Sequence, residues 1–296
     1  MRYRICHVTH YRYSESVSSS QHDVHLLPRH LPHQRCLSAE IAVVPAPVVC
    51  HERADYYGNR ANHIALATSH TELVVTARSQ VEVTPRPPLI AADDVPWEIA
   101  VTNLAEPHCD LDLVAQEMVF PSPFVVPWPD LAAYAGLSFP AGRPLLDACI
   151  DLMGRMRRDF VYDPGATTIA TPIVEVFQER RGVCQDFAHL MIACLRALRL
   201  SALYVSGYLV TTPPPGQPRL QGADASHAWL AVWSPRFGFV DLDPTNNLLP
   251  SEAHIALAIG RDFGDVTPLR GVILGGGHHE LHVGVDVTPE SLPSFA

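Results

Sequence analysis

The sequence contains no lysine, because all 21 of its basic residues are arginine. The chain therefore offers no side-chain amine that a reactive acyl group could modify. With 31 acidic residues, the formal net charge is -10 at pH 7, which argues against nucleic acid or an anionic membrane as a partner. The N-terminus lacks the apolar core of a secretory signal, and no later run reaches the roughly 18 apolar residues of a membrane span.

Cysteine is sparse and irregularly spaced. The seven cysteines are an odd number without a repeating interval, which suits a reducing cytoplasm better than a disulfide framework. We therefore expect a cytoplasmic protein. The 296 residues, of which 47% are hydrophobic and 18% charged, are enough for two globular domains. The sequence leaves the oligomeric state open.

The chain up to about residue 85 predicts a sheet or sandwich of short antiparallel strands. The expected strands are rich in β-branched or alternating residues and cover residues 2–13, 37–44, 61–66 and 72–83, with a hairpin turn at 57–60. The histidines of this part have no Cys/His pairing at zinc-site spacing, so no metal site is expected.

A proline-rich segment at residues 84–88 marks the predicted domain boundary, because proline ends strands and stiffens linkers. We expect a β-rich domain at 1–88 and a second domain at 89–296, with its core at about 145–250 and C-terminal strands reaching residue 296. Its expected elements are helices at 145–160 and 172–180, strands at 202–210, 272–274 and 279–287, and a loop at 261–265. Residues 211–225, rich in proline and polar side chains, predict a surface loop at the rim of a substrate cleft.

The segment 182–198 predicts an amphipathic helix. Its apolar stripe comprises Phe187, Leu190, Met191, Cys194, Leu195 and Leu198. Cys184 lies at the N-terminus of this helix, where free amide groups and the positive end of the dipole favour a thiolate. A buried core cysteine is the alternative interpretation. His189 is not expected to act as a base, because it lies about 140° around the helix from Cys184.

A hairpin downstream brings a histidine and an aspartate together. A loop at residues 234–236 puts His227 directly opposite Asp243, and a loop centred on residue 236 makes the two diagonal neighbours. Either register leaves their side chains on one face, roughly 4.5–8 Å apart between β-carbons. Asp241 shares that face and is a rival partner. The alternative interpretations are a half-buried strand histidine and a strand-ending Asp-Pro turn.

These residues fill the roles of a thiol catalyst. Cys184 would be the nucleophile, His227 its partner and later proton donor, and Asp243 the acceptor that fixes the ring. The backbone N–H of Cys184 is an expected oxyanion donor, and Gln178 or Gln185 would add a side-chain donor.

The motifs around these positions are Gly182-Val183-Cys184-Gln185-Asp186-Phe187-Ala188-His189, Tyr204-Val205-Ser206-Gly207-Tyr208, His227-Ala228-Trp229 and Asp243-Pro244-Thr245-Asn246. Together they resemble the bacterial transglutaminase-like family. The resemblance covers essentially the whole chain: residues 28–29, 34 and 58–59 are similar to the N-terminal domain of that family, and residues 260–263 with 268–271 match its C-terminal signature.

The resemblance implies an α+β fold, with a papain-like core in which the cysteine helix packs on an antiparallel sheet. It assigns the catalytic triad to Cys184, His227 and Asp243, and makes Tyr208 and Trp229 further substrate-site candidates. It implies no cofactor. The chain departs from the family pattern at Ala231, Phe239 and residues 198–204, which bears on substrate preference more than on chemistry.

We therefore expect a cofactor-free thiol enzyme that forms an acyl intermediate from an amide. Hydrolysis of a peptide or protein amide is favoured, because the sequence shows no separate site for an amine donor. The alternatives are an amine-accepting transglutaminase that forms isopeptide bonds and a non-catalytic peptide-binding module.

Overall fold

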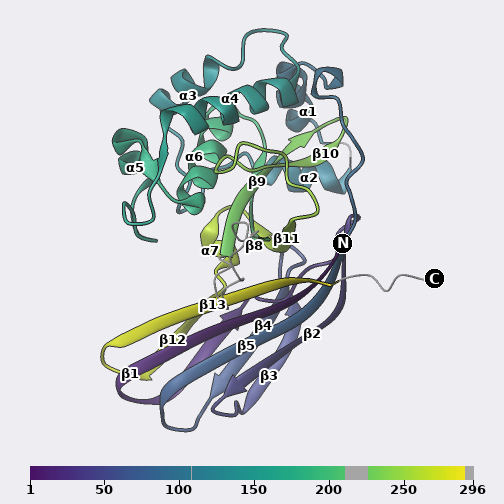
Figure 1. Cartoon of the computed structure of the whole chain (residues 1–296). Helices are drawn as coiled ribbons and strands as arrows, with labels where there is room; N and C mark the ends of the chain where they lie inside the picture. The colour runs from purple at the N-terminus through teal and green to yellow at the C-terminus, as the bar shows by residue number, and fades with distance from the viewer. Residues whose placement is uncertain (108, 211–225, 291–296) are drawn as a thin grey trace, which may run out of the picture.

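The computed structural model describes residues 1–107, 109–210 and 226–290. The predicted loop at 211–225 lies outside the described residues. Helices cover one end of the molecule, a large sheet forms the other, and a smaller sheet lies between them (Figure 1). No helix in the described ranges is long and apolar enough to cross a membrane.

The large sheet is built around β1 (Arg2–Val24), which continues well past its predicted end at Tyr13. The other strands are β2 (Gln34–Val44), β3 (Val49–Ala54), β4 (Arg60–Leu66), β5 (His70–Val83), β12 (Leu269–Gly275) and β13 (His279–Glu290). Strands β5 and β13 flank the first half of β1, and β4 and β12 flank its second half. All these pairings are antiparallel, as the sequence predicted. Gly58 adopts φ +71 in the turn between β3 and β4, a conformation that favours glycine.

Strands β12 and β13 join this sheet and not the smaller one. In β13, His279 pairs with Tyr13 and Glu290 with Arg2, so the sheet is built from both ends of the chain. The sequence predicted that the C-terminal strands belong to the domain at 89–296, whereas in the structure they belong to the large sheet. An alternating pattern identifies a strand but not its partner, and β1 is long enough to pair with different strands along its two halves.

The smaller sheet contains four antiparallel strands among the described residues, in the order β10-β9-β8-β11. Their bounds are β8 (Ala202–Leu209), β9 (Ser226–Ser234), β10 (Gly238–Leu242) and β11 (His254–Gly260). The helical elements are η1 (Ala91–Asp93), α1 (Trp97–Ala105), α2 (Asp110–Glu117), α3 (Pro129–Gly136), α4 (Leu145–Asp159), α5 (Ile173–Glu179), α6 (Cys184–Ala197) and α7 (Phe263–Val266). Two short strands, β6 (Val161–Tyr162) and β7 (Arg181–Gly182), pair in parallel. The mixed α+β fold class is therefore confirmed.

Helix α6 packs between the other helices and strands β8 and β9 (Figure 1). Its predicted apolar stripe forms part of the largest hydrophobic cluster, with Leu190, Met191, Cys194 and Leu195 fully buried. The sequence did not predict β3, β11 or α7. Helix α7 lies in the expected loop at 261–265, where Asp262 accepts a hydrogen bond from the Gly264 N–H at 2.8 Å and so caps a single turn.

The two sheets share a small apolar interface. Its buried residues are Tyr3, Ile5, Val81, Val83, Val285 and Val287 from the large sheet and Tyr208, Ile255 and Leu257 from the smaller one. Two side-chain amides of the large-sheet region also bind the backbone of the edge strand β11. Gln34 donates to and accepts from Ala256, and Asn59 does the same with Ile259, each bond being 2.8 Å long.

Candidate active site

Cys184 occupies the first position of α6 and is half-buried. The helix start is fixed by Asp186, whose Oδ2 accepts hydrogen bonds from the Val183 N–H at 2.8 Å and the Thr167 hydroxyl at 2.6 Å. These bonds tie the preceding loop to the helix. The first backbone N–H groups of a helix have no partner within it, so they are available to a negatively charged group beside Cys184.

His227 and Asp243 come together through the β9–β10 hairpin. Phe239 pairs with Trp233 and Leu242 with Leu230, which is the register centred on residue 236. His227 and Asp243 are therefore diagonal neighbours, one of the two predicted arrangements, and the Nε2 atom of His227 lies 2.7 Å from Oδ2 of Asp243. This bond leaves Nδ1 as the ring nitrogen available to the thiol.

The histidine is held in its charged form. Burial lowers the pKa of His227, but hydrogen bonds with Asp243 and with Cys184 outweigh burial and raise that pKa to about 9. Burial alone would raise the pKa of Asp243, which is fully buried, yet hydrogen bonds from His227 and His254 hold it well below its usual range. The carboxylate is thus ionised and the ring is an imidazolium at neutral pH.

A second histidine that the sequence did not single out also binds Asp243. Nε2 of His254, on β11, lies 3.1 Å from the same carboxylate oxygen, and Asn246 Nδ2 donates to that oxygen at 2.7 Å. The backbone N–H groups of Thr245 and Asn246 bind the other oxygen at 3.0 and 3.2 Å. Five donors therefore fix the carboxylate.

The same side chains include the only set among the described residues whose ligand atoms lie close enough to hold a metal ion. These are His227, Asp243 and His254, whose ligand atoms lie within 4.8 Å of one another. In this structure both histidine nitrogens are hydrogen-bonded to the same Asp243 oxygen. A cation bound there would occupy the ring nitrogen that orients His227.

Trp229 lies beside His227, two residues along the same face of β9. Its fully buried ring stacks on the His227 ring at 6.0 Å and contacts the His254 ring edge-on at 5.3 Å. The Trp229 ring can pack here because residue 207 on β8 is a glycine. A Cβ at this position would lie 2.5 Å from the indole and 2.2 Å from the Ile255 carbonyl oxygen. The Trp229 ring therefore packs against both histidine rings and supports their positions.

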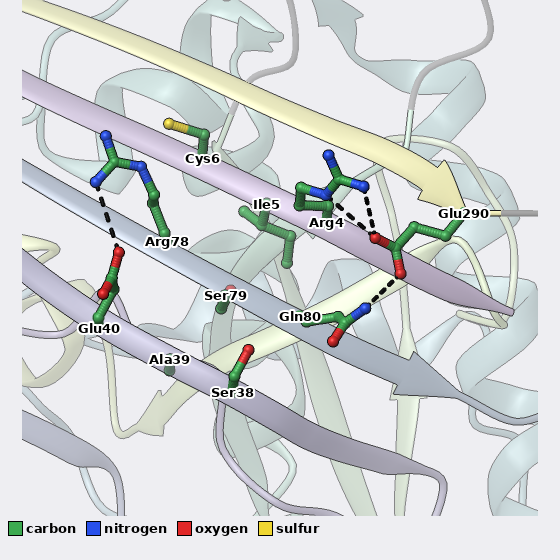
Figure 2. A pocket seen from close by; sticks show the side chains of 10 residues that line it. All are labelled: Arg4, Ile5, Cys6, Ser38, Ala39, Glu40, Arg78, Ser79, Gln80 and Glu290. Atoms are coloured by element: carbon green, nitrogen blue, oxygen red, sulfur yellow. Dashed lines mark hydrogen bonds and ion pairs between the residues drawn. The ribbon is translucent and has the colours of Figure 1, made fainter.

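A cleft of about 340 Å³ opens beside Cys184 and His227. Its other lining residues are Arg157, Tyr162, Leu209, Ser226, Thr245 and Asn246. A larger hollow of about 670 Å³ lies on the open face of the large sheet, where Arg4 and Gln80 bind Glu290 and Arg78 pairs with Glu40 (Figure 2). No histidine lines that hollow, so the smaller cleft is the candidate active site.

The remaining candidates are placed as follows. Gln178 is exposed on α5 and Gln185 is half-buried on α6, and neither lines the described part of the cleft. Tyr208 is fully buried between the sheets, 2.8 Å from the His7 ring, so its proposed contact with substrate is wrong. The rival Asp241 is paired with Arg86 at 2.6 Å.

His189 is placed as the sequence predicted. Its Nε2 accepts a hydrogen bond from the Phe263 N–H at 3.1 Å, and burial lowers its pKa to about 4. A neutral ring buried in the core, with Nε2 bound to the backbone, cannot serve Cys184.

Comparison with known families identifies both parts of the chain. Residues 3–82 match the bacterial transglutaminase-like N-terminal region, and residues 140–244 match the transglutaminase-like superfamily core. An uncharacterized protein of Mycobacterium tuberculosis is 41% identical over 300 residues, covering 97% of this chain and 93% of the relative. The chain belongs to the bacterial transglutaminase-like family. An uncharacterized protein of Mycobacterium leprae is 30% identical over 290 residues, covering 97% of this chain and 98% of the relative.

Two further comparisons are more limited. A protein-glutamine gamma-glutamyltransferase of Pseudomonas aeruginosa is 30% identical over 107 residues, which is 33% of this transglutaminase-like chain and 16% of that protein. A solved structure of a candidate cysteine protease from Cytophaga hutchinsonii has a TM-score of 0.75 at 20% identity, covering 100% of this chain and 93% of the other. The latter likeness shows the fold alone.

Proposed function

We propose that the protein is a thiol enzyme that cleaves amide bonds of peptides or proteins through an acyl-enzyme, with Cys184, His227 and Asp243 as its catalytic residues. The proposal rests on one observation. A half-buried sulfur at a helix N-terminus shares a cleft with an imidazolium whose far nitrogen is bound by a buried carboxylate. This is the arrangement that nucleophilic catalysis by cysteine requires.

The reaction follows from the roles of these groups. The Cys184 thiolate attacks the carbonyl carbon, and the oxyanion that forms is stabilised by the backbone N–H of Cys184 at the start of α6. Nδ1–H of His227 then protonates the nitrogen of the breaking C–N bond, and the amine leaves. The thioester is next attacked by water, whose proton passes to the now neutral His227 as the thiolate is released. Asp243 stays ionised throughout and orients the ring.

Water is the favoured acceptor. The cleft is lined by the exposed side chains of Arg157, Ser226 and Asn246, so the thioester forms beside solvent. Transfer to an amine is the second candidate, and it is favoured by the match over 107 residues to the Pseudomonas gamma-glutamyltransferase. Transfer requires that an amine reach the thioester faster than water does.

A paired assay tests the proposal. The protein is incubated with glutamine-containing peptides, with and without an added primary amine, and ammonia release, peptide cleavage and amine incorporation are followed by mass spectrometry. We expect ammonia or cleavage products without incorporated amine, and no turnover by Cys184→Ala. Incorporation of the amine in most products would favour the transferase instead.

Thiol reactivity separates both from the binding-module alternative. We expect iodoacetamide to modify Cys184 faster than Cys50, an exposed thiol on β3, and His227→Ala to remove that difference. A Cys184 that reacts no faster than this exposed thiol would contradict any thiol chemistry at this site.

A further inference from the structure

Arg157 places a positive charge in the cleft. It lies in the last turn of α4, is exposed, and lines the same cleft as Cys184 and His227. Tyr162, which follows on β6, lines the cleft beside it. The sequence gives no signal for this position, because arginine on the polar face near a helix C-terminus is typical of any surface helix.

The guanidinium of Arg157 has no partner within the described part of the chain. Its neighbour Arg155, by contrast, donates to the Tyr134 carbonyl at 2.8 Å and to Ser138 at 3.0 Å. None of the described residues that line the cleft is acidic. The charge therefore faces a cleft in which no described side chain neutralises it.

This arrangement distinguishes substrates by their charge. The protein as a whole carries a formal charge of -10, which disfavours the approach of an anion. A lone arginine beside the nucleophile reverses that preference locally, and its planar fork of N–H donors matches a carboxylate. The hydroxyl of Tyr162, which is exposed, offers a further donor to such a group.

We propose that Arg157 selects acyl donors that carry a carboxylate close to the amide to be cleaved. This inference rests on the proposed thiol chemistry at Cys184. The carboxylate belongs either to an acidic side chain next to that amide or to the α-carboxyl end of the peptide.

The charge preference can be measured without knowing the substrate. Iodoacetate and iodoacetamide alkylate a thiol by the same displacement of iodide and differ chiefly in charge. The rate of Cys184 modification by each is measured at low ionic strength in the full-length protein. Cleavage after arginine yields the peptide 182–196, and fragment ions distinguish Cys184 from Cys194.

The variants isolate the charge of one residue. We expect Arg157→Gln to lower the iodoacetate-to-iodoacetamide rate ratio at Cys184 by about threefold, the size of an exposed ion pair. Arg157→Lys should keep most of the ratio, and raising the salt concentration should reduce it in the wild type. Arg158→Gln is the matched control, because Arg158 is the next residue, is equally exposed and does not line the cleft.

Three probes on one scaffold then distinguish the two sources of carboxylate. These are N-iodoacetyl glutamine amide, which is neutral, N-iodoacetyl glutamate amide, and N-iodoacetyl glutamine free acid. A loss of rate in Arg157→Gln confined to the glutamate probe supports recognition of a side chain, and one confined to the free acid supports recognition of the chain end.

An unchanged ratio in Arg157→Gln, or an equal change in Arg158→Gln, would overturn the inference. That failure is distinct from failure of the proposed function. The ratio concerns charge alone, whereas the proposed function fails if Cys184 reacts no faster than the exposed Cys50 with neutral iodoacetamide.

Discussion

Replacing Asp243 by asparagine tests the electrostatics of the site most directly. The substitution keeps the shape of the side chain but puts an NH₂ group where Oδ2 or Oδ1 now accepts hydrogen bonds. Oδ2 faces His227 at 2.7 Å, His254 at 3.1 Å and Asn246 Nδ2 at 2.7 Å, all of them donors. The variant must therefore rotate the amide or change the tautomer of His227, which moves the proton to Nδ1 and keeps the ring neutral.

The size of the effect follows from the pKa of His227. Raising that pKa from 6.5 to about 9 corresponds to about 3 kcal/mol in favour of the imidazolium. Without the carboxylate, burial still lowers the pKa and the hydrogen bond with Cys184 still raises it, so the pKa falls from about 9 toward its usual value of 6.5. At pH 7.5 a ring with a pKa of about 9 is almost fully protonated, whereas one at or below 6.5 is at most about one-tenth protonated.

The assay is an NMR titration of the His227 ring in the wild type and in Asp243→Asn, together with peptide turnover. We expect the titration midpoint to fall from about 9 toward 6.5 and turnover to drop by about a hundredfold or more. Asp241→Asn is the matched control: Asp241 lies two residues earlier and pairs with Arg86, so its loss should leave the His227 titration in place. A midpoint that stays near 9 in Asp243→Asn would refute the reasoning.

Three further outcomes are expected. Turnover should fall as the pH rises through about 9, because His227 then loses the proton that it gives to the leaving amine. The raised pKa of His227 also stabilises the folded protein. That stabilisation is complete below pH 6.5 and is lost as the pH rises through about 9, which urea unfolding at several pH values would show. His254→Phe should lower turnover about tenfold and shift the upper limb of the pH profile. His254→Gln keeps a donor toward Asp243 and should recover part of the loss. An unshifted profile in His254→Phe would mean that His254 only fills space. Gly207→Ala should cost about 3 kcal/mol or more of unfolding free energy, because a Cβ would lie 2.2 Å from the Ile255 carbonyl oxygen, and an unfolding midpoint equal to that of the wild type would contradict this close approach.

The sequence predicted those parts of the site that local patterns determine. The hairpin register brought His227 and Asp243 together, the helix pattern put Cys184 at a helix start, and the family resemblance placed Cys184 beside the other two. The register could only be narrowed to two choices, because turn length decides it, and the structure has the diagonal one. Both choices keep the side chains on one face, so the prediction did not depend on which was right.

The rest depended on contacts between distant segments. Strand β11 is a short apolar run buried on both faces, without the alternation that identifies half-buried strands, so neither the strand nor His254 was predicted. Tyr208 was wrongly predicted to contact substrate because its motif lies in the smaller sheet, which borders the cleft. Its side chain points instead into the interface between the two sheets. No local pattern shows that Arg157 lines the same cleft as Cys184.

The large sheet contributes to the site through the edge of the smaller one. Strand β11 is an edge strand of the four-stranded sheet, and an edge leaves backbone groups unpaired. Gln34 and Asn59 bind those groups at Ala256 and Ile259, in the manner of a neighbouring strand. The strand held in this way carries His254, which in turn binds the carboxylate of the proposed triad. Two amides near the start of the chain therefore act on the geometry of the cleft without touching it, which gives a physical reason for the β-rich N-terminal part to accompany this catalytic core.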